Sequence, residues 1–137
     1  MKRLKIIAGV DEVGRGCLAG PVVSAAVILK KGIKIKNLKD SKKLNFKQRI
    51  EIVKNIKKNS FFSIGLASVK EIEKLNILQA SLLSMKRAII NLSKKPDLVL
   101  VDGNFAPQVD SRCKTIVKGD EKIKCISAAS VLAKVYR

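Results

Sequence analysis

Short apolar runs alternate with helix-like periodic segments along the 137 residues of this chain. The runs at 5–11, 21–29, 60–68 and 97–102 predict buried strands, and 115–118 predicts a fifth, shorter strand. Apolar residues recur every three or four positions at 46–58 and again between Leu78 and Leu92, which predicts two amphipathic helices. The last segment, 125–137, is small, apolar and helix-like. The pattern therefore predicts a single α/β domain without internal repeats.

Polar residues mark where the helices begin. A residue that accepts a hydrogen bond from the helix start, followed three positions later by Glu or Gln, is the pattern of a capping box. This pattern occurs at Asn45/Gln48, Ser68/Glu71 and Asn76/Gln79. The helix after Asn45 is expected to bury one face, formed by Phe46, Ile50, Val53 and Ile56.

Two of the predicted strands end in an acidic residue. The first three strands suit an antiparallel arrangement, and 97–102 suits a parallel position beside the first strand, so that Asp11 and Asp102 follow adjacent strand ends. Adjacent strands lie about 4.8 Å apart, and the two carboxylates are therefore expected to converge on a common ion. Neighbouring residues on a strand point to opposite faces, so Glu12 can join Asp11 only if the strand kinks there. Each acid alone would fit an ordinary turn or cap equally well.

The charge of the chain points to a polyanionic partner. Lys and Arg number 29 against 11 acids, a formal charge of +18, and neutralising phosphates releases condensed counterions. Aromatic residues make up only 4% of the chain and Trp is absent, which argues against a stacking platform for single strands and favours a duplex read through its backbone. A basic, non-catalytic nucleic-acid-binding module would also fit this charge. No apolar run approaches the roughly 20 residues of a membrane span, and a cytoplasmic protein is expected.

Histidine is absent from the sequence. This excludes histidine-based zinc sites and nucleophiles that depend on histidine, so an enzyme would have to use carboxylates and metal ions. Oxygen ligands suit Mg²⁺ or Mn²⁺. Cys17, Cys113 and Cys125 lie far apart and are expected to be buried or half-buried thiols.

Two further segments suggest contacts with phosphate. In the glycine-rich turn after Glu12, Gly14 and Gly16 allow close approach of backbone amides to a ligand and Arg15 can bind a phosphate, although a plain hairpin turn is equally compatible. The run DSKKL at 40–44 could likewise be a solvated charge run.

Several segments of the chain stand out together: GVDEVGRGCLAGPVV, DSKKL, NILQASLLSMKRA, LVLVDG, and KGD followed by ISAASVLAKVYR. They resemble ribonuclease HII, the bacterial type 2 ribonuclease H. The resemblance implies a ribonuclease H-like fold with a mixed five-stranded sheet flanked by helices. It also implies two-metal hydrolysis of the RNA strand in RNA-DNA hybrids, and incision at ribonucleotides embedded in duplex DNA, leaving 5′-phosphate and 3′-hydroxyl ends.

The resemblance also assigns roles to individual residues. It implies that three acids bind Mg²⁺ or Mn²⁺ and catalyse the reaction, that a glycine-rich turn senses the ribose 2′-hydroxyl, and that two lysines contact the substrate backbone. The acids are Asp11, Glu12 and Asp102, the turn is Gly14, Arg15 and Gly16, and the lysines are Lys42 and Lys43.

The family pattern continues beyond the last residue of this sequence. In the family, the run that here ends at Arg137 is followed by an Asp, the fourth catalytic carboxylate, and then by helices and a tyrosine that stacks beneath the ribose. Residues 1–137 are therefore expected to form a catalytic domain that lacks these C-terminal helices and has weak or no nuclease activity by itself. No protein partner is required by the sequence.

Overall fold

A mixed five-stranded sheet forms the centre of the computed structural model, which describes residues 5–14, 20–36, 38 and 41–137. The strands are β1 (Ile7–Val13), β2 (Val22–Leu29), β3 (Ser60–Ala67), β4 (Leu98–Asp102) and β5 (Arg112–Ile116), in the order β3-β2-β1-β4-β5. β1, β2 and β3 pair antiparallel, while β4 is parallel to both β1 and β5. The predicted fold class and the predicted position of β4 beside β1 are confirmed.

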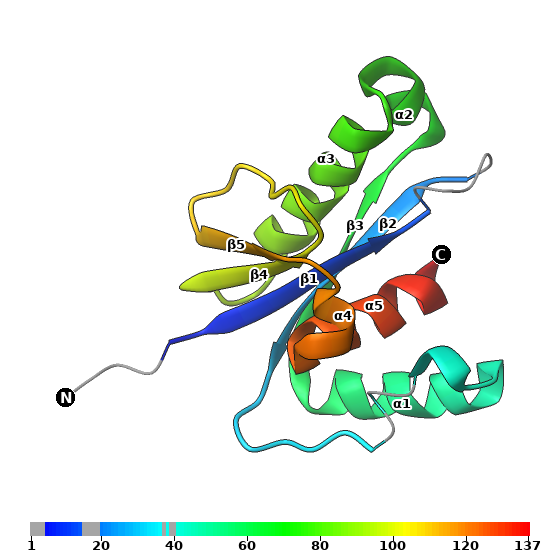
Figure 1. Cartoon of the computed structure of the whole chain (residues 1–137), viewed down its shortest axis with the longest axis vertical. Helices are drawn as coiled ribbons and strands as arrows, with labels where there is room; N and C mark the ends of the chain where they lie inside the picture. Colours follow the sequence, from blue (N-terminus) through cyan, green and yellow to red (C-terminus); the bar gives the residue numbers. More distant parts are fainter. Residues whose placement is uncertain (1–4, 15–19, 37, 39–40) are drawn as a thin grey trace.

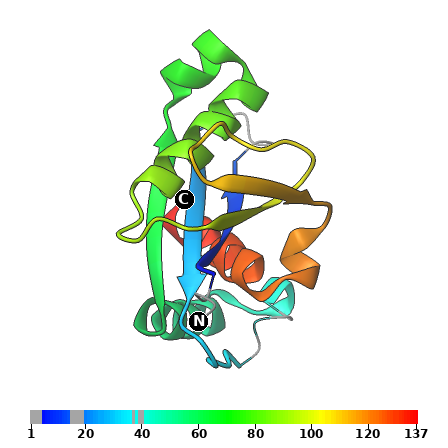
Figure 2. The same ribbon diagram turned by 90° about the vertical axis from the view of Figure 1, so that its left-hand side faces the viewer.

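Helices cover both faces of this sheet (Figures 1 and 2). α1 (Phe46–Lys58) and α5 (Lys124–Tyr136) pack on one face with a core that includes Ala25 and Val27 of β2. α3 (Ile77–Ile90) packs on the other face, against alternate residues of β1, β2 and β4. The remaining helical elements are short: the 3-10 turn η1 (Ser41–Lys43), α2 (Val69–Leu75) and α4 (Gly119–Lys122).

α5 lies unusually close to β1. A Cβ atom added to Gly9 would come within 2.3 Å of the backbone carbon of Cys125, so only glycine lets helix and strand approach this closely. Every residue of α5 from Cys125 to Ala133 is buried. The contact fixes α5, and the short α4 that precedes it, over the end of β1.

Several local predictions are confirmed and three need correction. The capping boxes at Asn45 and Ser68 form as predicted. Phe46 was wrongly placed in the core, because it is 69% exposed at the first turn of α1, where no other element covers it. The fifth strand is Arg112–Ile116 instead of 115–118, because its ladder with β4 begins at Arg112, and α4 was not predicted at all.

The remaining sequence expectations concern thiols and membranes. Cys125 is buried and Cys113 is half-buried, as predicted, and both are free thiols, while Cys17 lies outside the described residues. Within the described part of the chain, no helix has the length and apolar character required to cross a bilayer.

Candidate active site

Asp11 and Asp102 lie side by side near the carboxyl ends of two parallel strands, because Asp11 is two residues before the end of β1 and Asp102 is the last residue of β4. Val10 of β1 is in register with Val101 of β4, so the next residue of each strand carries an acid. Val10 and Val101 face α3, and Asp11 and Asp102 therefore face the opposite side, toward α4 and α5. The predicted convergence of these two acids is confirmed.

A third acid, Asp120, completes the cluster. One carboxylate oxygen from each of Asp11, Asp102 and Asp120 lies within 4.8 Å of the others. Asp120 comes from α4, whose position depends on the residues at its start. Lys118, just before the helix, adopts a left-handed conformation with a φ of 55°. The amide of Gly119, the first residue of α4, donates a hydrogen bond to Asp102 Oδ1 at 2.8 Å. Asp102 thus orients the helix that carries Asp120.

Burial and mutual repulsion make this cluster electrostatically unfavourable. Desolvation, followed by the charges of Glu12 and Asp102, raises the pKa of Asp11 from 3.8 to about 8, although the Glu12 amide donates to Asp11 Oδ1 at 2.8 Å. Desolvation also raises the pKa of Asp102, and the charge of Asp120 adds to this effect against the hydrogen bond from Gly119. A cation among the three carboxylates would relieve both penalties.

Lys42 provides a cation at the edge of the cluster. Its ammonium lies 2.9 Å from Asp120 Oδ2 and 3.8 Å from Glu121 Oε1. The hydrogen bond and charge of Asp120 raise the pKa of Lys42. η1 and α4 are therefore joined at the site although they lie far apart in the sequence.

Comparison with known proteins identifies the family. Residues 8–137 match the family described as Ribonuclease HII. The chain belongs to the ribonuclease HII family.

Curated relatives and solved structures agree with this assignment. The chain is 60% identical to the ribonuclease HII of Pelagibacter ubique, covering 98% of this chain and 73% of the relative. It is 53% identical to that of Coxiella burnetii, covering 96% and 66%, so the chain spans about two thirds to three quarters of the length of these relatives.

The ribonuclease HII of Archaeoglobus fulgidus, solved in a complex with PCNA, superposes with a TM-score of 0.82 at 29% identity, covering 96% of this chain and 72% of that one. A Bst ribonuclease HIII solved with Mn²⁺ superposes with a TM-score of 0.81 over 96% of this chain and 51% of its own, and its 20% identity shows a shared fold.

Glu12 is not a member of the three-acid cluster. The β1–β2 ladder keeps one register through Val13, so the kink that Glu12 would need in order to join Asp11 is absent and Glu12 is paired with Ser24. The Ser24 hydroxyl bonds that of Ser84 on α3, which places this pair on the opposite sheet face from Asp11. A metal-binding role for Glu12 remains a prediction.

The residues predicted to bind the substrate are only partly described. Gly14 has a φ of +109°, and an added Cβ would lie 2.7 Å from the Pro21 carbonyl oxygen, so glycine is required where β1 leads into the turn. Arg15 and Gly16 lie outside the described residues. Lys43 is exposed beside Lys42 in η1.

Asp120 is the site residue that sequence reasoning missed. Its signal was the Lys118-Gly119-Asp120 triplet, which formed part of the family resemblance but carried no assigned role. Nothing local indicates that Gly119, 17 residues after Asp102 in the chain, donates a hydrogen bond to it, and this contact brings Asp120 into position.

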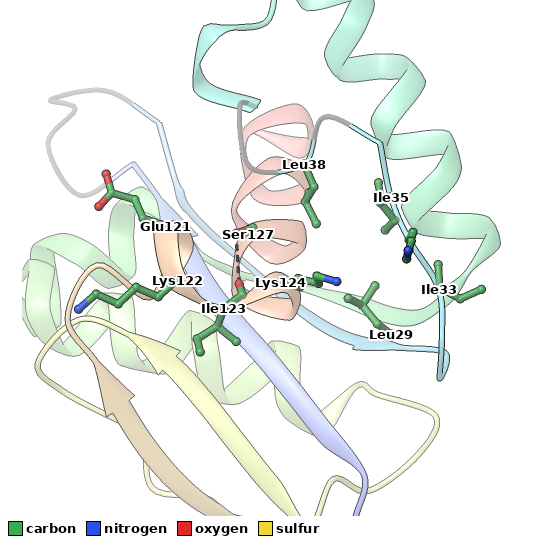
Figure 3. A pocket seen from close by; sticks show the side chains of 10 residues that line it. Leu29, Ile33, Ile35, Leu38, Glu121, Lys122, Ile123, Lys124 and Ser127 are labelled. Atoms are coloured by element: carbon green, nitrogen blue, oxygen red, sulfur yellow. Dashed lines mark hydrogen bonds between the residues drawn. The ribbon is translucent and has the colours of Figure 1, made fainter.

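A separate pocket lies beside α4 and the start of α5 (Figure 3). It encloses about 350 Å³ between residues 29–38 and residues 121–127 and includes Leu29, Ile35 and Ile123 in its wall. None of the three clustered acids lines it. Three lysines also line it, but Glu121 is the one carboxylate among its lining residues, so it offers no group of acids for a metal ion, and the acid cluster is the candidate catalytic centre.

The donor set of the cluster fits a hard divalent cation. Three carboxylates without nitrogen or sulfur ligands favour Mg²⁺ or Mn²⁺. The raised pKa values of Asp11 and Asp102 fit the same conclusion, because a bound cation would offset the desolvation and mutual repulsion that raise them.

Proposed function

We propose that this chain hydrolyses the RNA strand of RNA-DNA hybrids and incises duplex DNA at embedded ribonucleotides, leaving 5′-phosphate and 3′-hydroxyl ends. The observation that carries the proposal is the meeting of Asp11, Asp102 and Asp120 at one edge of the sheet in a member of the ribonuclease HII family. The formal charge of +18 favours binding to the phosphate backbone of such a duplex.

Asp11, Asp102 and Asp120 would hold Mg²⁺ or Mn²⁺, with Glu12 as a further candidate ligand. The bound ions supply an activated water and stabilise the leaving oxygen of the phosphodiester. The residues of the chain have three tasks: Asp102 both offers a carboxylate and orients α4, Gly14 gives the turn at the end of β1 its shape, and Lys42 and Lys43 would contact the substrate backbone.

The test is incision of a duplex that contains one ribonucleotide, with the protein in excess and with Mg²⁺, Mn²⁺ or EDTA. Wild-type protein should cut weakly, and only in the presence of metal. Asp102→Asn should cut more than about a hundredfold more slowly still, because it removes one charge from the metal site and weakens the hydrogen bond that Gly119 donates. Asp110→Asn is the matched control, since it removes the same charge from an exposed position before β5.

The alternative is a non-catalytic basic nucleic-acid-binding module. It predicts salt-sensitive duplex binding that depends neither on Mg²⁺ nor on Asp102, and no incision at any protein concentration. That result would refute the proposed activity.

A further inference from the structure

The ammonium of Lys42 already occupies a cation position at the acid cluster. It contacts Asp120 at 2.9 Å, and the two side chains differ in exposure: that of Lys42 is 56% exposed and that of Asp120 is 14% exposed. A largely exposed lysine therefore balances the charge of a mostly buried carboxylate that belongs to the proposed metal site.

A divalent ion and this ammonium compete for the same carboxylate. Asp120 lies within 4.8 Å of Asp11 and Asp102, so an ion held by the three acids would lie close to the lysine nitrogen. Two cations at such a short separation repel each other strongly in a partly buried site. The repulsion is relieved when the ammonium leaves, because its side chain reaches open solvent.

The lysine can leave at little cost. The ammonium is more than half exposed, so water solvates it at once when it leaves, and one such ion pair contributes far less than a divalent ion held by three carboxylates. Glu121 Oε1 lies 3.8 Å from the ammonium and offers a second, exposed anion after Asp120 is lost. η1 is a three-residue turn, so its lysine side chains are not held by a long helix.

We propose that Lys42 is a positioning residue, whose ammonium holds the Asp120 carboxylate in the metal-free protein and is displaced from it when a divalent ion binds to Asp11, Asp102 and Asp120. The inference rests on the proposed function, because it assumes that the cluster binds metal. Displacement leaves the ammonium beside Glu121, at the edge of the site, with its charge available to a phosphate group.

The test is Mn²⁺ binding to the 137-residue chain without nucleic acid. Binding is measured by calorimetry and by the decrease in the electron paramagnetic resonance signal of free Mn²⁺. Lys42→Met should bind Mn²⁺ about twofold to fivefold more tightly than wild type, since the ion no longer displaces an ion pair. Lys42→Arg should restore an affinity close to that of wild type.

Lys43→Met is the matched control. It removes the same charge one residue away, and among the described residues Lys43 forms no ion pair with α4. Its effect should be clearly smaller than that of Lys42→Met, because a solvated charge is screened by salt. Circular dichroism melting of each variant in EDTA checks that the exposed substitutions leave the fold intact.

The possible outcomes separate the two proposals. Equal Mn²⁺ affinities for Lys42→Met and Lys43→Met, or weaker binding by Lys42→Met while wild type binds normally, would overturn the role of Lys42 alone. Failure of wild type and every variant to bind Mn²⁺ would overturn the proposed metal-dependent function, and this inference with it.

Discussion

Replacing Asp11 by Asn should stabilise the metal-free protein while abolishing its metal-dependent function. Asp11 is 7% exposed, and its pKa is raised to about 8. In the unfolded chain the same group has a pKa of 3.8. Between these two values the unfolded chain has lost the proton and the folded chain retains it, so the free energy of unfolding falls as the pH rises.

The size of the effect follows from the shift. One pKa unit corresponds to about 1.4 kcal/mol. The rise in the pKa of Asp11 from 3.8 to about 8 therefore lowers the free energy of unfolding by about 5 kcal/mol at pH 8. Asn has nearly the same shape and does not ionise. The stability advantage of Asp11→Asn over wild type should therefore grow by roughly 4 kcal/mol between pH 5 and pH 8.

Urea unfolding in EDTA at pH 5, 6, 7 and 8 measures this difference. Asp110→Asn, at an exposed loop position, corrects for the general effect of removing one negative charge. Adding Mn²⁺ at pH 8 should stabilise wild type and leave Asp11→Asn almost unchanged. Parallel pH profiles for wild type and Asp11→Asn would refute the electrostatic reasoning.

Two further substitutions test the packing and capping that support the site. Gly9→Ala should lower the free energy of unfolding by at least about 3 kcal/mol in urea, because its Cβ would lie 2.3 Å from the Cys125 backbone, which cannot rotate away. The control Gly32→Ala has no atom within 4 Å of the added Cβ and a φ of +76°, and it should lose only about 1–2 kcal/mol. Equal losses for the two variants would contradict the close-approach argument. Asn45→Ala should lower stability by about 1 kcal/mol, because Asn45 Oδ1 accepts from the Gln48 amide at 2.9 Å, and an unchanged urea midpoint would show that this cap contributes nothing.

The parts of the site that could be predicted are those set by strand order and residue type. Asp11 and Asp102 each follow an apolar run, and the parallel pairing of β1 with β4 brings them together through backbone register alone. Sequence periodicity and capping patterns determine such features because they involve neighbouring residues or whole elements. The same reasoning correctly predicted the capping boxes of α1 and α2.

The parts that could not be predicted depend on contacts between distant residues. α4 has only four residues, and its start is fixed by the hydrogen bond from Gly119 to Asp102, which no local pattern encodes. Phe46 shares a helical face with the buried Val53 and Ile56 but is 69% exposed in the first turn of α1, so its position on that face was insufficient. The regular register at Glu12 is likewise set by pairing with β2, which continues through Val13.

The packing of α5 onto β1 has a consequence for how the protein is made. β1 is among the first segments to leave the ribosome, yet its partner strand β4 begins at Leu98 and the helix that fits against Gly9 begins at Lys124. Contacts of such large sequence separation form late and slowly. Asp11, Asp102 and Asp120 therefore cannot meet in a short nascent chain. The acid cluster is assembled only after translation has passed α5.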